Sequence, residues 1–226
     1  DMGAHKSRSV LQMVGIILGV GSVVATFGLI DGGRRQGQKF WEETGGIKKM
    51  FIRELDAREM KQNALEKRSK GLTYDDALAL QAQATTLELV EPTMERREIV
   101  KAPGFEKELE VAGSTPTYEH MYDFHPVEGR FLTPEDIARS AKVVVLGSTR
   151  REQLFGGRPA VGQVLSIGAD RYTVVGVMER KEFYWNSANR NALEWMNEMM
   201  FVPVTSVITR MVGDRENQKV AYINVQ

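Results

Sequence analysis

The pattern of hydrophobic and polar positions is dominated by one stretch, Ser9–Ile30, which contains no Asp, Glu, Lys or Arg. As a helix, this stretch would span roughly 33 Å, close to the roughly 30 Å hydrocarbon core of a bilayer. The alternative is a buried core helix, but such helices are usually shorter and amphipathic. The stretch also exceeds the apolar region of a signal peptide, and no Ala-x-Ala cleavage site follows it. The pattern therefore predicts a transmembrane helix.

Small residues recur inside this predicted span. Gly15 and Gly19 form a GxxxG pair, and Gly21 and Ala25 repeat the small-xxx-small spacing. Such spacing lets a second helix backbone approach closely within lipid. Glycine is also common in membrane helices without such a role, so two interpretations stay open: a helix-packing face at these four positions, or ordinary composition.

Polar residues and glycines follow the span. Arg34–Glu43 predicts a helical stem that frays at its glycines and ends at Gly45–Gly46. Met50–Ile52 is a short apolar run and predicts a strand. Asp56–Lys70 is almost wholly polar and predicts an exposed helix or loop with a solvated face.

Further apolar runs, separated by turn residues, predict a series of strands. These are Glu95–Val100, Phe105–Val111, Lys142–Leu146, Val164–Ile167, Tyr172–Met178, Met199–Val202 and Val220–Val225. Thr73, three residues before Asp76, resembles a capping box at the start of a helix. Two more short helices are predicted at Thr149–Phe155 and Thr205–Val212.

Strand–helix–strand order occurs twice, over Met50–Val100 and over Met199–Val225. We expect an α+β domain in which these two units share one sheet, with the chain from Gly113 to about Arg190 inserted between them.

Composition excludes few classes of protein. The 226 residues allow one or two domains, the formal net charge of +0 gives no indication of a nucleic-acid partner, and the absence of Cys excludes disulfides and thiol catalysis. Lys6 and Arg8 before the span balance Arg34, Arg35 and Lys39 after it, so the charges near the span do not set its orientation.

Candidate catalytic and metal-binding residues are sparse. The three histidines are His5, His120 and His125. The spacing of the last two does not put both on one helical face, and a metal site there would need Asp123 or Glu119 to converge on them. Ordinary loop histidines are the preferred interpretation.

Ser148 follows a predicted strand in a strand–turn–helix setting, but VLGSTRR is not the G-x-S-x-G pattern of a nucleophile elbow. The nearby glycines do not form a phosphate-binding loop either. The sequence therefore predicts no catalytic, cofactor or metal site, and the only candidate site residues are the four small residues of the span.

Three sets of residues, taken in order, carry a resemblance to a known family. The first set is Arg8–Ser9, Leu11–Gly15 and Ile17–Val20. The second is Gly129–Phe131, Val145–Gly147, Leu154–Gly156, Val161–Gly162 and Val174–Val177, and the third is Phe201–Val204. Together they resemble the first transmembrane segment and periplasmic core of the MacB-type, FtsX-like ABC transporter permeases.

The resemblance implies a domain organisation. Residues 1–8 would be a cytoplasmic end, 9–30 the transmembrane helix and 31–46 the stem. Residues 47–112 and 197–226 would form a porter-like subdomain, and 113–196 an inserted, β-rich sabre-like subdomain.

The resemblance also implies a function and partners. The chain would be a non-catalytic permease subunit in the bacterial inner membrane, with its main domain on the periplasmic side, relaying ATP-driven motion for export or mechanotransmission. An ABC ATPase would bind the ATP, a second permease copy or paralogue would complete a dimer, and a periplasmic adaptor or cargo protein is a further partner. The alternative is a single-span sensor or adaptor that binds a ligand outside the cytoplasm.

Overall fold

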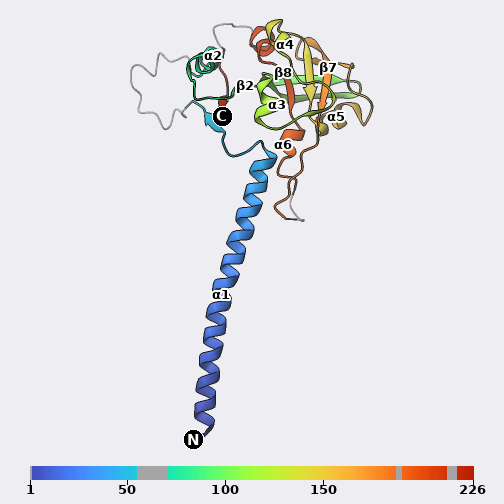
Figure 1. Cartoon of the computed structure of the whole chain (residues 1–226). Coiled ribbons are helices and arrows are strands. Elements are labelled where there is room, and N and C mark those ends of the chain that lie inside the picture. The colour runs from blue at the N-terminus through green and yellow to red at the C-terminus, as the bar shows by residue number, and fades with distance from the viewer. Residues whose placement is uncertain (1, 55–70, 187–189, 213–217) are drawn as a thin grey trace. The chain divides into compact units, whose positions relative to one another are not determined.

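The computed structural model describes residues 2–54, 71–186, 190–212 and 218–226. The predicted polar segment Asp56–Lys70 lies outside these residues. The chain divides into two compact units, Asp1–Glu42 and Glu43–Gln226 (Figure 1).

The first unit is one helix, α1, which runs from Met2 to Glu43. By length and composition, it could cross a membrane. Two hydroxyl side chains of α1 form hydrogen bonds to the backbone of the same helix. Ser22 Oγ donates to Gly19 O and Thr26 Oγ1 donates to Ser22 O, each at 2.8 Å. Hydroxyl groups bonded in this way can lie in lipid without unpaired donors.

The predicted fraying of the stem is wrong, because α1 continues without a break through Gly32, Gly33 and Gly37. A glycine inside a helix costs about 1 kcal/mol relative to alanine but does not block helical backbone angles. Side-chain pairs four residues apart support this part of the helix: Asp31 with Arg35 at 2.8 Å, and Gln38 with Glu42 at 3.0 Å.

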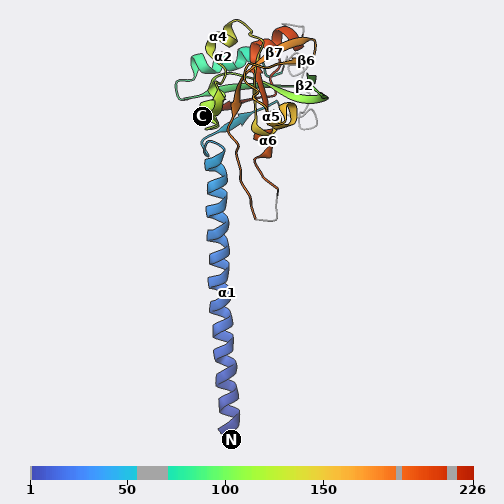
Figure 2. The same ribbon diagram turned by 90° about the vertical axis from the view of Figure 1, so that its right-hand side faces the viewer.

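The second unit is built on a mixed sheet, which has nine strands among the described residues. The strands are β1 (Met50–Ile52), β2 (Val90–Ala102), β3 (Phe105–Ser114), β4 (Pro126–Gly129), β5 (Val143–Leu146), β6 (Val164–Ile167), β7 (Asp170–Met178), β8 (Met200–Pro203) and β9 (Tyr222–Val225). Their order is β1-β9-β2-β3-β8-β5-β7-β4. Beside this path, β6 pairs with β2 and β7, and these three strands are labelled in Figure 2.

Short helices cover this sheet. They are α2 (Tyr74–Gln83), α3 (Thr117–Met121), α4 (Pro134–Ala138), α5 (Ser148–Phe155), α6 (Glu194–Asn197), α7 (Val204–Ser206) and the π-helical turn η2 (Val207–Met211). The predicted capping box of Thr73 with Asp76 is confirmed at the start of α2. The predicted helix Thr205–Val212 is instead one α-turn followed by the π-turn, in a run rich in β-branched residues, which fit an α-helix poorly.

Two glycine turns join predicted strands into hairpins. β2 and β3 pair from Met94↔Gly113 to Ala102↔Phe105 around Gly104, whose φ of +81° needs a glycine. β6 and β7 pair antiparallel around Gly168.

The predicted start of β2 is wrong, because the strand begins at Val90 and contains Pro92. Proline is normally confined to strands with a free edge, since it has no N–H to donate. At Pro92 the strand meets this condition: β2 pairs with β9 over Val90–Thr93, and its pairing with β3 begins only at Met94.

Strand pairing crosses the boundary between the two predicted parts. β1, β9 and β2, all assigned to the porter-like part, are neighbours in the sheet. β8, assigned to the same part, pairs with β3 on one side and with β5 of the sabre-like part on the other. The division into 47–112 with 197–226 and 113–196 therefore stays a prediction.

The register of β2 with β9 gives this part of the sheet two different faces. Val90 pairs with Val225 and Pro92 with Ile223, and these residues face α2 and the main hydrophobic core. Glu91 pairs with Asn224 and Thr93 with Tyr222, so these four side chains lie on the opposite face because side chains alternate along a strand. We call Glu91, Thr93, Tyr222 and Asn224 the polar layer.

Candidate functional site

The centre of the polar layer is Glu91, which is fully buried. Its carboxyl group accepts hydrogen bonds from β3 and the residue after it: Ser114 Oγ at 2.7 Å, Thr115 N at 3.0 Å, and Thr115 Oγ1. Glu91 thus ties the start of β2 to the end of β3, at the point where the two strands stop pairing.

Burial controls the protonation of Glu91. Removal from water raises the pKa of its carboxyl to about 8, against the opposing effect of the hydrogen bonds from Thr115 and Ser114. At neutral pH the group therefore retains its proton, and the layer contains a neutral carboxylic acid.

Asn224, the partner of Glu91 in the register of β9, is also fully buried. Neither its amide nitrogen nor its amide oxygen has a hydrogen-bond partner among the described residues. A buried polar group without a partner costs about 1–3 kcal/mol of stability.

Two tyrosines lie near this layer: Tyr118 on α3 and Tyr122 directly after it. The rings of Tyr118 and Tyr122 are stacked, with centroids 4.3 Å apart, and the Tyr118 ring lies 4.6 Å from that of Phe201 on β8. Burial, and secondarily the Glu91 and Glu95 carboxyls, raise the pKa of the Tyr122 hydroxyl. The phenols therefore stay neutral and can donate hydrogen bonds next to the layer.

The segment Thr44–Lys49, which opens the second unit, packs directly on α3. Gly45 has a φ of +85°, and a Cβ atom added to it would lie 2.7 Å from the Cα of Tyr122. Lys49 Nζ lies 4.0 Å from the centroid of the Tyr122 ring and also donates to Thr44 O. Burial lowers the pKa of Lys49 to about 8, because removal from water disfavours the charged form of the amine.

These contacts form one connected arrangement, which we call the joint: Thr44–Lys49, then α3, then the polar layer. It connects the entry of the chain into the second unit to β9 and β2, near one end of the strand order. Sequence reasoning missed the joint. The available signals were a glycine pair directly after a helix and a glutamate between two apolar residues in LVEPT.

The structure brings His125 together with the two acids considered for a metal site. His125 Nδ1 lies 3.0 Å from Glu119 Oε1, and Nε2 lies 2.9 Å from Asp123 Oδ1. Because both ring nitrogens point at carboxylates, neither has a lone pair free for a metal, and no group of metal ligands occurs among the described residues. His120 is exposed on α3.

Ser148 has a structural contact. Its Oγ lies 3.2 Å from Asn197 Oδ1, and the same Oδ1 accepts a hydrogen bond from Lys181 N at 2.9 Å. The hydroxyl therefore links the start of α5 to α6. This partner is an amide oxygen, which cannot act as the base of a nucleophile.

The four small residues of the span, Gly15, Gly19, Gly21 and Ala25, lie on α1 with exposed surfaces. A Cβ atom on any of the three glycines would meet no other atom within 4 Å. Their role in helix packing stays a prediction.

Comparison with known families assigns the chain. The family model described as "MacB-like periplasmic core domain" matches residues 9–226, which include both α1 and the sheet. The chain belongs to this family, as the resemblance implied.

Three curated relatives match over nearly the whole chain. The macrolide export ATP-binding/permease protein MacB of Bdellovibrio bacteriovorus is 26% identical over 94% of this chain, and MacB 1/2 of Paracoccus denitrificans is 30% identical over 94%. The pyoverdine export ATP-binding/permease protein PvdT of Pseudomonas putida is 26% identical over 97%. The chain spans 30–32% of the length of these relatives.

Two solved structures share the fold. The periplasmic region of MacB from Actinobacillus actinomycetemcomitans superposes with a TM-score of 0.63 at 16% identity, over 82% of this chain and 76% of that one. The extracellular domain of the noncanonic ABC-type transporter YknZ gives 0.59 at 16% identity, over 78% and 81%. The predicted α+β fold of an extracytoplasmic domain is confirmed.

Proposed function

We propose that this chain is the membrane-anchored, extracytoplasmic part of an ABC transporter permease. The match of one family model to α1 and the sheet together supports this proposal, as do relatives named ATP-binding/permease proteins. A single-span sensor is not favoured by these matches. The inner membrane is the proposed location, with residues 1–8 in the cytoplasm and the second unit in the periplasm.

The proposed role of the chain is mechanical. ATP would be bound and hydrolysed by an ATPase domain or subunit, with no cofactor in this chain. A second permease copy and a periplasmic adaptor or cargo protein are the further partners we propose. Displacement of α1 would reach the sheet through the joint, since Thr44–Lys49 is the first segment of the second unit and packs on α3.

The proposed transmission of displacement from α1 to the sheet rests on the close approach of Gly45 to Met121 and Tyr122. The first prediction compares Gly45→Ala with Gly46→Ala in the complete transporter. Both glycines have positive φ, +85° and +91°, so both substitutions strain the backbone by about 1–2 kcal/mol. Only at Gly45 would the methyl group also collide with α3, because a Cβ at Gly46 meets nothing within 4 Å.

We expect Gly45→Ala to reduce transport by about tenfold or more while basal ATP hydrolysis continues, and Gly46→Ala to have a much smaller effect. Transport and ATP hydrolysis are measured on the same preparations, with membrane insertion checked by fractionation. Equal effects of the two substitutions would show that the contact with α3 is not used for coupling.

A further inference from the structure

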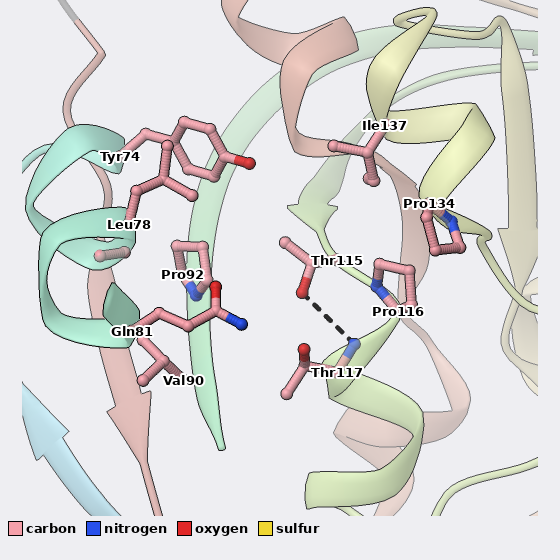
Figure 3. A pocket seen from close by; sticks show the side chains of 11 residues that line it. Tyr74, Leu78, Gln81, Val90, Pro92, Thr115, Pro116, Thr117, Pro134 and Ile137 are labelled. Carbon is pink, nitrogen blue, oxygen red and sulfur yellow. Dashed lines mark hydrogen bonds between the residues drawn. The ribbon is translucent and has the colours of Figure 1, made fainter. Parts of the chain in front are cut away.

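A cavity of about 280 Å³ lies on the other face of the sheet from the polar layer. One wall is α2, with Tyr74, Leu78 and Gln81, and the floor is Val90 and Pro92 of β2. The opposite wall comes from residues 115–117 and from Pro134 and Ile137 of α4, as Figure 3 shows.

The walls of this cavity are rigid. Pro92, Pro116 and Pro134 have fixed φ angles and no N–H group that would need a partner. Thr115 is held in place by two hydrogen bonds to the buried Glu91, and its Oγ1 also accepts from Thr117 N at 3.3 Å. Because these walls are already fixed, a ligand that enters the cavity does not have to order them, and binding avoids that entropic cost.

The residues that line the cavity are uncharged, and this determines which ligands it can bind. None of the residues that line it is Asp, Glu, Lys, Arg or His. An ion placed here would lose its hydration without a counter-charge, which costs several kcal/mol. The occupant is therefore uncharged.

Polar groups in the cavity are few and directional. Figure 3 shows the Tyr74 hydroxyl and the Gln81 amide pointing from α2 into the space between the walls, with the Thr117 hydroxyl on the far side. The remaining lining is apolar, and Leu78 at its edge is 45% exposed although it is a large apolar side chain. The volume equals that of about nine water molecules in the liquid and lies just below the range of drug-sized sites.

We propose that this cavity is a binding site for a small, uncharged, mainly apolar molecule with one hydroxyl or carbonyl group. The apolar body lies against Leu78, Pro92 and Ile137, and the polar group pairs with Gln81 or Thr117. The site shares Thr117 with the joint, but the proposal does not rest on the mechanical role of the joint.

The test uses three probes of the same shape: cyclohexanol, cyclohexanecarboxylate and cyclohexylammonium. Each is titrated into the whole chain in lipid nanodiscs, with NMR detection of the methyl groups of Ala77 and Ile137. We expect saturable shifts with cyclohexanol and affinities lower by about tenfold or more for both ions. Equal shifts with all three probes, or no saturable shift with cyclohexanol, would overturn the proposal.

Two variants locate the binding. Gln81→Trp fills the opening of the cavity from an exposed position of α2 and should abolish binding, whereas Gln83→Trp, on the same helix but outside the lining, should not. Thr117→Val keeps the shape and removes one hydroxyl, so it should weaken binding severalfold without altering the fold. Undiminished cyclohexanol binding in both Gln81→Trp and Thr117→Val would place the probe elsewhere and overturn the assignment.

Discussion

At the scale of single residues, Glu91 is the clearest case of chemistry set by burial. Its carboxyl lies between β2 and β3 with three hydrogen-bond donors around it, and burial still dominates its pKa. A neutral carboxylic acid at the centre of the joint makes the stability of the second unit depend on pH.

The second prediction concerns this dependence. The pKa of Glu91 rises from 4.5 in the unfolded chain to about 8 in the folded chain. Its contribution to stability is therefore fully present below pH 4.5 and is lost as the pH rises through about 8, at about 1.4 kcal/mol per pH unit between these values. Glu91→Gln, which resembles the protonated acid, should remove this loss.

The measurement is urea unfolding of residues 43–226 at pH values from 5 to 8.5. Glu108→Gln is the matched control, because Glu108 is exposed on β3. The account of Glu91 would be contradicted if Glu91→Gln and the wild type lost stability in parallel over this range.

The third prediction concerns His125. Hydrogen bonds to Glu119 and Asp123 raise the pKa of its imidazole above 6.5. The stability from this pair is present below pH 6.5 and declines as the pH rises through the raised pKa. NMR titration of the ring should give a midpoint above 6.5, and both Glu119→Gln and Asp123→Asn should lower it. A wild-type midpoint at or below 6.5 would mean that the acids do not bond to the ring in solution.

At the scale of elements, α1 has two separate properties. Ser9–Ile30 is apolar and rich in small residues. Asp31–Glu43 is mostly polar and remains helical through three glycines. Helix continuity matters for the proposed relay, because a helix transmits displacement along its axis, whereas a flexible segment does not.

The fourth prediction tests the small residues of α1 as a packing face between permease copies. The double substitution Gly15→Ile and Gly19→Ile should weaken self-association of the chain in membranes, because the larger side chains keep the two backbones apart. Val20→Phe, about 120° around the helix from both the Gly15–Gly19 pair and the Gly21–Ala25 pair, is the control and should have little effect. Association is measured by energy transfer between labelled chains in vesicles, and unchanged association of the glycine variant would exclude this face.

Several elements of the fold follow from local signals in the sequence. The hairpins and α2 were predictable, because a glycine turn, strand alternation and the pair Thr73–Asp76 are local signals. The pair Thr133–Asp136 is the same capping signal and marks α4, which the sequence analysis did not identify.

Other features depend on contacts that are distant in sequence. Pro92 argued against a strand at the start of β2, and only the absence of β3 beside it makes the strand possible. The position of β8 between β3 and β5 has no local signal either. The joint, built from Gly45, α3 and the polar layer, was therefore not predictable from local patterns.

At the scale of the whole molecule, the account is a series of connected parts: an apolar helix, its continuous polar extension, the joint, and a sheet with a ligand-sized cavity on its other face. The family model matches α1 and the sheet together and assigns the chain to the MacB-like periplasmic core domain family. The central claim is that α1 drives the second unit mechanically and is more than a tether.

The most direct test of this claim is an insertion of about ten Gly and Ser residues between Gln38 and Lys39 in the complete transporter. The matched control is the same insertion after Gly104, in the exposed turn between β2 and β3, where nothing crowds the backbone. Transport, basal ATP hydrolysis and membrane insertion are measured for both. We predict that the insertion in α1 abolishes transport while ATP hydrolysis and insertion survive, and that the control retains transport. Full transport with the insertion in α1 would contradict the account and show that the helix is only a tether.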